Sequence, residues 1–136
     1  MNLIIDEGNT SIKVALFKKG IQTFFLSFAK DGFQESFLSK VPLNEVTHCI
    51  IASVVTGVKE RFSFLEQLLP DVLYLTAETP VPFVNKYATP HSLGIDRLAL
   101  VAGAVTRFPN RNALIIDAGT CITFDIVTDR KEYLGG

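Results

Sequence analysis

The sequence of 136 residues has no tryptophan, one methionine and only two cysteines, Cys49 and Cys121, which stand far apart. Isolated cysteines form no C-x-x-C pair, so neither a disulfide framework nor a zinc site is indicated, and we expect two buried, reduced thiols. No apolar run approaches the ~18 residues of a membrane span, and no secretory signal pattern opens the chain. These absences argue against a membrane-spanning protein and predict a cytoplasmic one.

The chain also lacks an excess of charge of either sign. Thirteen basic and fourteen acidic side chains give a net charge of −1, so no overall field attracts nucleic acid or an anionic membrane, and neither is expected as a partner. The motifs G-x-x-x-x-G-K-[ST] and G-x-G-x-x-G are both absent, which excludes the P-loop and Rossmann types of nucleotide site. Hydrophobic residues at 48% and charged residues at 20% are typical of a globular domain.

Hydrophobic periodicity predicts a mixture of strands and helices. Strands are expected at 1–6, 11–17, 22–28, 47–55, 71–75, 112–117 and 123–127, and helices at 31–40, 59–69 and 95–108. The first three strands should be antiparallel, and the continuous apolar strand at 47–55 should be buried on both faces. Residues 76–90 contain three prolines and predict an ordered, irregular loop of the kind that often has a function. The order of elements favours an α/β fold.

An internal repeat is the most informative feature of the sequence. Residues 4–10, IIDEGNT, align with residues 115–121, IIDAGTC, at an offset of 117 − 6 = 111 residues. In each copy an apolar strand ends in an aspartate, and a glycine follows that either turns with positive φ or lets the backbone approach a ligand closely. Successive N–H groups in such a turn form an anion site, so the pair predicts a clamp for the phosphates of a nucleotide.

The charged residues in these turns allow more than one role. Asp6 and Asp117 would repel phosphate, so their expected role is to hold a cation or its water shell. Lys13 could reach a phosphate, or it could simply be an exposed lysine on a strand without a binding role. The competing interpretation of the motif is structural, because Asp-x-Gly is a common hairpin turn.

Three blocks in order resemble the type III pantothenate kinases of the acetate and sugar kinase/Hsp70/actin superfamily. Residues 6–13 resemble the first phosphate motif, residues 87–97 the pantothenate motif, and residues 117–123 the second phosphate motif, while 133–136 resemble its continuation. The sequence Gly94-Ile95-Asp96-Arg97 is the most distinctive part, since it is not generic to the superfamily. Glu7 departs from the family pattern, which has a neutral or apolar residue there.

The resemblance implies the fold and the reaction. The fold is an α/β ribonuclease H-like lobe with a mixed sheet opened by antiparallel strands, followed by the start of a second, duplicated lobe of the actin-like ATPase type. The lobes would span residues 1–109 and 110–136. The reaction would be ATP-dependent phosphorylation of pantothenate to 4'-phosphopantothenate, the first step of coenzyme A biosynthesis. Mg²⁺ near Asp6 and a monovalent cation, K⁺ or NH4⁺, would assist.

The resemblance also implies roles for individual residues. ATP would be bound by Asp6, Glu7, Gly8, Asn9, Thr10, Ser11, Ile12, Lys13 and Thr120, and pantothenate by Tyr87, Gly94, Ile95, Asp96 and Arg97. Asp96 would be the catalytic proton acceptor, and Asp117 would coordinate the monovalent cation. From the residues alone, Asp96 could instead only stabilise a helix N-terminus, and Arg97 could form a structural ion pair in place of a substrate contact.

The same resemblance implies a homodimer and a longer protein. The 136 residues would lack the adenosine pocket and a further substrate-binding threonine, so we expect this piece to be inactive alone. A non-catalytic regulator resembling Bvg accessory factor is the alternative function. Another superfamily kinase, acting on a sugar or an acid, fits the phosphate turns but not the Gly-x-Asp-Arg block.

Overall fold

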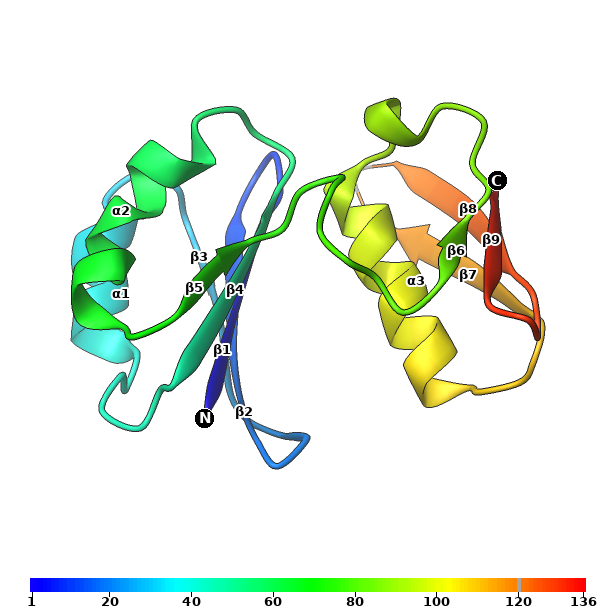
Figure 1. Ribbon diagram of the computed structural model, residues 1–136. Coiled ribbons are helices and arrows are strands. Elements are labelled where there is room, and N and C mark those ends of the chain that lie inside the picture. Colours follow the sequence, from blue (N-terminus) through cyan, green and yellow to red (C-terminus); the bar gives the residue numbers. More distant parts are fainter. Residues whose placement is uncertain (120) are drawn as a thin grey trace. The chain divides into compact units, whose positions relative to one another are not determined.

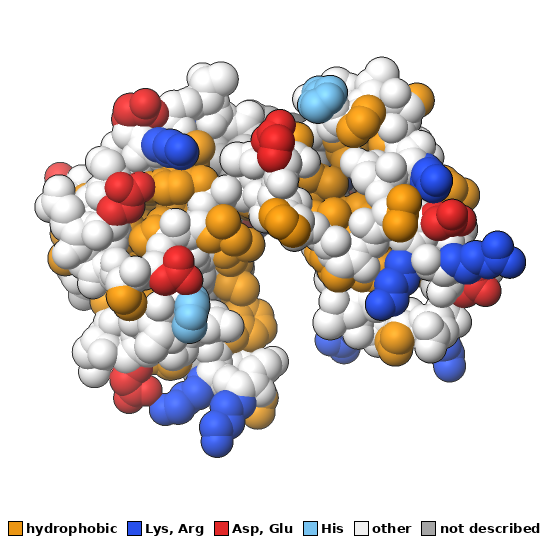
Figure 2. All heavy atoms as spheres, in the orientation of Figure 1, with side chains coloured by type: hydrophobic (Ala, Val, Ile, Leu, Met, Phe, Trp, Pro, Cys, Tyr) orange, Lys and Arg blue, Asp and Glu red, His pale blue; other side chains and the backbone are white. Residues whose placement is uncertain are grey.

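The computed structural model describes residues 1–119 and 121–136, which form two compact units, 1–75 and 76–136 (Figure 1). This division follows packing, and it falls before the lobe boundary at 109/110 expected from the duplicated phosphate motifs. That expected boundary stays a prediction. The helices of the described residues include none long and apolar enough to cross a membrane. On the face shown in Figure 2, acidic and basic side chains occur on both units.

Unit 1 is a mixed five-stranded sheet with two helices. Its elements are β1 (Asn2–Glu7), β2 (Ile12–Lys18), β3 (Ile21–Phe28), α1 (Phe33–Lys40), β4 (His48–Ser53), α2 (Val58–Leu68) and β5 (Val72–Tyr74). The strand order is β3-β2-β1-β4-β5, with antiparallel pairs among β1 to β3 and parallel pairs from β1 through β4 to β5. The predicted antiparallel opening is confirmed.

The core of unit 1 lies between this sheet and its helices. Alternate residues of β1 and β2, including Leu3, Ile5 and Val14, are fully buried because a strand turns successive side chains to opposite faces. They pack against aromatic residues of α1 and α2, among them Phe37 and Phe62. One prediction is wrong here: β4 alternates between buried and partly exposed residues, so only one of its faces is covered.

Unit 2 is a four-stranded sheet covered on one face by one long helix. It contains β6 (Val84–Asn85), the 3-10 helix η1 (Pro90–Ser92), α3 (Ile95–Arg107), β7 (Ala113–Ala118), β8 (Ile122–Val127) and β9 (Glu132–Gly135). The strand order is β6-β9-β8-β7. Leu98, Val101 and Val105 of α3 pack with Val127 and Tyr133 of the sheet. The predicted loop at 76–90 therefore contributes the short edge strand β6, and β9 was not expected.

The two cysteines differ in burial, and the fold class is the predicted one. Cys49 is buried and free, as predicted, whereas Cys121 is exposed, so the prediction of two buried thiols is wrong for Cys121. It lies at the β7–β8 turn, where no layer covers it. The mixed α/β architecture that opens with antiparallel strands and repeats a strand hairpin in unit 2 confirms the predicted fold class.

Candidate active site

Both copies of the repeated motif form the turn of an antiparallel hairpin, as the sequence predicts. In the first, the N–H of Gly8 donates to the carbonyl of Ser11 at 3.0 Å, and in the second the N–H of Gly119 donates to the carbonyl of Cys121 at 3.0 Å. Neither glycine has a positive φ. The sequence offered two explanations for these glycines, a positive φ or the close approach of a ligand to the backbone. The first explanation is wrong, and the second stays a prediction.

The two turns differ in length, and this changes what faces each aspartate. In the register of β1 with β2, Asp6 lies opposite Lys13, whereas Asp117 of β7 lies opposite Thr123 of β8. Lys13 Nζ is 3.8 Å from Asp6 Oδ2, and both side chains are more than a third exposed, so this ion pair is weak. The first aspartate thus faces a cation and the second a hydroxyl group.

Glu7 points to the other face of β1 from Asp6 and is 1% exposed. Its carboxylate accepts hydrogen bonds from Arg61 Nε at 3.0 Å, Arg61 Nη2 at 2.7 Å and the Ser53 hydroxyl at 2.6 Å. Arg61 also donates to the carbonyl of Val55 in the segment between β4 and α2. The charge of Glu7 is therefore balanced inside unit 1.

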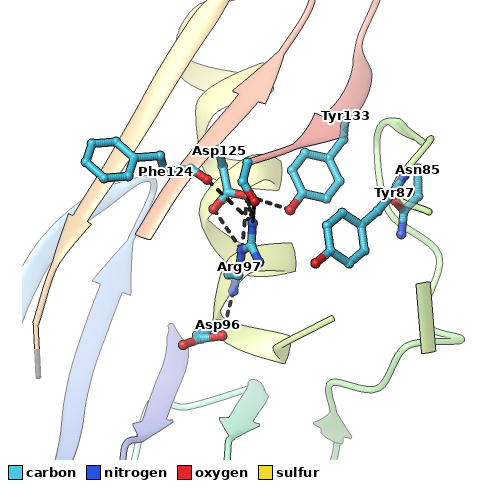
Figure 3. Close-up of polar contacts among 8 residues, drawn as sticks. Asn85, Tyr87, Asp96, Arg97, Phe124, Asp125 and Tyr133 are labelled. Carbon is cyan, nitrogen blue, oxygen red and sulfur yellow. Dashed lines mark hydrogen bonds and ion pairs between the residues drawn. The ribbon is translucent and has the colours of Figure 1, made fainter. Parts of the chain in front are cut away.

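The predicted substrate residues lie together in unit 2, around the first turn of α3 (Figure 3). Asp96 Oδ1 accepts a hydrogen bond from the backbone N–H of Arg97 at 2.8 Å, which holds the carboxylate at the helix N-terminus. A Cβ built on Gly94 would lie 2.4 Å from that same Asp96 oxygen. Glycine at this position therefore leaves the space that the Asp96 carboxylate occupies.

Arg97 forms the structural ion pair that the sequence left as one of two possibilities. Nε donates to both carboxylate oxygens of Asp125, at 3.0 and 3.1 Å, and Nη2 donates to Oδ1 at 2.5 Å. The pKa of Arg97 is raised above its ordinary value, chiefly by the hydrogen bond to Asp125. An arginine side chain is always charged, and the two-pronged donor set of Arg97 is used within the chain.

Aromatic rings complete this group. The Arg97 guanidinium carbon lies 5.3 Å from the centroid of the Tyr87 ring, and the Tyr87 ring stacks on Tyr133 at 6.0 Å with an interplanar angle of 18°. The Tyr87 N–H donates to Asn85 Oδ1 at 3.0 Å. Gly135, with φ of 90°, is required beneath this ring, because a Cβ there would lie 2.5 Å from a Tyr87 ring carbon.

The family model of the type III pantothenate kinases matches residues 2–136. The chain belongs to this family.

Curated type III pantothenate kinases are similar along the whole chain. The protein from Christiangramia forsetii is 45% identical over 139 residues, and the one from Bacteroides fragilis strain ATCC 25285 is 41% identical over 138 residues. Each alignment covers 100% of this chain and 56% of the relative. The chain therefore spans about half the length of the curated pantothenate kinases it matches.

Solved structures support the fold. A protein from Campylobacter jejuni described as a Baf family transcriptional activator has a TM-score of 0.57 at 22% identity, covering 98% of this chain and 52% of its own. One from Porphyromonas gingivalis described as an N-acetylglucosamine kinase has a TM-score of 0.53 at 12% identity, covering 99% and 47%. At these identities the likeness extends to the fold alone.

Two residues of the group in this pantothenate kinase family member were not predicted as site residues. Asp125 was missed, and Tyr133 was noted only as part of the second motif. The sequence carries no clear signal for Asp125, because alternation in β8 places Ile122, Phe124 and Ile126 on one face, and only the structure shows that the opposite face with Asp125 is the buried one. A carboxylate on a covered strand face requires a cationic partner, although the sequence does not say which one.

The residues around Asp117 offer oxygen atoms that could hold a cation. The Thr123 hydroxyl oxygen opposite Asp117 is buried and has no hydrogen-bond partner among the described residues. A carboxylate beside an unsatisfied hydroxyl oxygen is a donor set that suits a hard monovalent or divalent cation. Over residues 1–119 and 121–136, no group of three His, Cys, Asp or Glu side chains gathers as a metal site. Thr120, predicted to bind ATP, lies outside the described residues.

Proposed function

We propose that the full-length protein phosphorylates pantothenate to 4'-phosphopantothenate with ATP, the first step of coenzyme A biosynthesis. The supporting observation is that Tyr87, Asp96 and Arg97, which match the pantothenate motif of the family, lie together at the first turn of α3 in unit 2. A homodimer and a cytoplasmic location belong to the same proposal. The 136-residue chain by itself is expected to be inactive.

Asp96 is proposed as the proton acceptor. Phosphoryl transfer passes through a loose transition state, so catalysis depends mainly on alignment and charge neutralisation. A carboxylate at the substrate hydroxyl orients the nucleophile and accepts its proton late in the reaction. The hydrogen bond from the Arg97 N–H to Asp96 Oδ1 leaves Oδ2 for this task. Tyr87, Gly94, Ile95 and Arg97 would surround the rest of pantothenate.

Residues 6–13 would bind the ATP phosphates, and Thr120 is proposed as a further ATP-binding residue. The side chains of Asn9 and Thr10 are exposed at the first turn and are available to a ligand. Glu7 and Ile12 have buried side chains, so their contribution would come through the backbone. Mg²⁺ would neutralise the phosphate charge, with Asp6 as the nearest protein carboxylate.

Asp117 is proposed to hold the monovalent cation, with the Thr123 hydroxyl beside it as a second oxygen. Bound there, the cation would offset the negative charge of the phosphates near the second turn. Asp117 suits this better than Asp6 because its cross-strand neighbour is a hydroxyl group and not Lys13.

The test measures ADP release by the full-length protein with ATP, Mg²⁺, K⁺ and pantothenate. The parent should turn over only when pantothenate is present, and Asp96→Asn should lower kcat about 10²- to 10⁴-fold, the usual contribution of a general base. Asp129→Asn, in the exposed turn between β8 and β9, is the matched control and should leave kcat unchanged. Normal turnover by Asp96→Asn would exclude the proton-acceptor role.

A regulator that acts by binding is the second candidate, because a solved structure of similar fold is described as a Baf family transcriptional activator. The ADP assay separates the two functions. A folded full-length parent without pantothenate-dependent ADP release would favour the regulator, whereas turnover that potassium stimulates would favour the kinase.

A further inference from the structure

We propose that Asp125, together with Tyr133, is a positioning residue that fixes the guanidinium of Arg97 in the substrate site. This inference rests on the proposed function, since it concerns how the same site orients its substrate. Asp125 and Tyr133 would not touch the substrate themselves. They would act through Arg97, whose side chain extends towards Asp125 (Figure 3).

The contacts around Asp125 form a closed set. Three hydrogen bonds from Arg97 reach its two carboxylate oxygens, and the Tyr133 hydroxyl donates to Oδ1 at 2.5 Å. Asp125 and Tyr133 are both 0% exposed, whereas the Arg97 side chain is 16% exposed. Of these three residues, Arg97 is thus the one whose side chain reaches solvent.

A buried carboxylate is costly unless charge and hydrogen bonds compensate it. Here the compensation comes from an arginine of α3 and a tyrosine of β9, brought to a residue of β8. The long Arg97 side chain would otherwise sample many rotamers, each with a similar energy. The Asp125 carboxylate selects one of them, and the Tyr87 ring at 5.3 Å limits the guanidinium on a second side.

This arrangement decides how Arg97 can meet a ligand. Because Nε and Nη2 both donate to Asp125, Arg97 cannot offer that two-pronged edge to a carboxylate or phosphoryl group. It would meet the substrate with its remaining edge, as a fixed positive charge. A charge held in place loses little freedom on binding, so its position should affect the affinity for the substrate.

The experiment measures KM for pantothenate and KM for ATP separately in the full-length protein. Asp125→Asn keeps the shape of the side chain and removes the charge, and Tyr133→Phe removes one hydrogen bond but keeps the ion pair and the ring. We expect KM for pantothenate to rise about tenfold and about threefold respectively, within the range of coupling seen for contacting residues, with KM for ATP unchanged.

A matched control separates positioning from simple destabilisation. Val127→Ala opens a cavity in the same strand, on the same covered face, within the apolar core that Val127 shares with Val101 and Val105. It should lower the fraction of active enzyme, and hence the apparent kcat, while KM for pantothenate stays the same. If Asp125→Asn does not fold, Tyr133→Phe still tests the proposal, because it retains the buried ion pair.

A double-variant cycle with Arg97→Ala decides whether Asp125 acts through Arg97. In that background Asp125→Asn should change KM for pantothenate less than about twofold, since the residue it positions is gone. The positioning role would be overturned if Asp125→Asn raised KM for pantothenate equally in the parent and in Arg97→Ala. It would also be overturned if neither Asp125→Asn nor Tyr133→Phe changed that KM. Either result would leave the proposed function standing. A full-length parent that does not turn over pantothenate would overturn the proposed function, and this inference with it.

Discussion

Glu7 and Arg61 form an ion pair with two hydrogen bonds at the end of β1, and they stand 54 positions apart in the sequence. The Glu7 carboxylate is 1% exposed, while the Arg61 side chain is 39% exposed. The pair connects the strand that leads into the first Asp-x-Gly turn with the first turn of α2. An acidic residue next to Asp6 is tolerated because it points to the opposite face and finds its own cation there.

Removing Arg61 should destabilise unit 1 strongly. Arg61→Ala leaves a buried, unpaired carboxylate, and loss of one partner of such a pair typically costs about 3–5 kcal/mol, with the partial exposure of Arg61 favouring the lower figure. Denaturant unfolding followed by circular dichroism measures this. Lys18→Ala, which breaks the exposed pair with Glu45, is the control and should cost about 1 kcal/mol or less. Equal effects of the two variants would contradict the role given to Glu7.

Gly94 and Gly103 offer a matched pair of glycine-to-alanine changes. A Cβ at Gly94 would displace the Asp96 carboxylate, whereas a Cβ at Gly103 in the middle of α3 meets no atom within 4 Å. Gly94→Ala should therefore lower kcat of the full-length enzyme with a small effect on stability, because a side chain can move where a backbone cannot. Gly103→Ala should raise stability by about 0.5–1 kcal/mol and leave kcat unchanged. A Gly94→Ala enzyme with parental kcat would show that the position of Asp96 is unimportant.

The two cysteines should react very differently with alkylating reagents. Burial, assisted by the nearby Asp71 carboxylate, raises the pKa of the Cys49 thiol from its ordinary value to about 12. At pH 8 iodoacetamide should therefore modify the exposed Cys121 and leave Cys49 intact until the protein unfolds. Peptide mass spectrometry gives the extent at each site. Rapid modification of Cys49 in the folded protein would contradict its burial.

The raised pKa of Cys49 also determines how the free energy of unfolding changes with pH. The pKa of Cys49 is higher in the folded than in the unfolded protein, so the folded state keeps the thiol proton to higher pH. The contribution of this thiol to the free energy of unfolding is therefore fully present below about pH 9 and is lost as the pH rises towards about 12. Between these limits the free energy of unfolding should fall more steeply for the parent than for Cys49→Val, which cannot ionise. Parallel curves for the two proteins would refute this contribution.

The sheet of unit 2 has an apolar face on the side away from α3. Six large apolar side chains are exposed there by 44–62%: Leu114, Ile116, Ile122, Phe124, Ile126 and Leu134. A contiguous apolar surface of this kind favours association, so the isolated 136-residue chain should self-associate as its concentration rises. Ile122→Lys should reduce the association in sedimentation velocity, whereas Ile21→Lys, on β3 of unit 1, should not. A parent that stays monomeric throughout would contradict the prediction.

Local patterns in the sequence predicted most of the secondary structure. Alternation in β1 and β2 and the helical spacing in α2 and α3 are properties of neighbouring residues, and they persist because packing follows the same periodicity. β6 and β9 were missed because each is short and depends on pairing with distant segments, β6 with β9 and β9 also with β8. The exposure of Cys121 and the half-covered state of β4 depend on which layers pack on the sheets, which periodicity does not report.

The sequence by itself determined the paired aspartate turns, the Gly94-to-Arg97 block and thereby the family, because these are short motifs whose residues are adjacent in the chain. Only the tertiary structure decided the partners of the charges. Arg97 meets Asp125 across 28 positions and Glu7 meets Arg61 across 54, and such contacts exist only once helices have packed on sheets. The cause is energetic: a carboxylate can be buried only where packing also brings a cation to it, and no local pattern specifies that meeting.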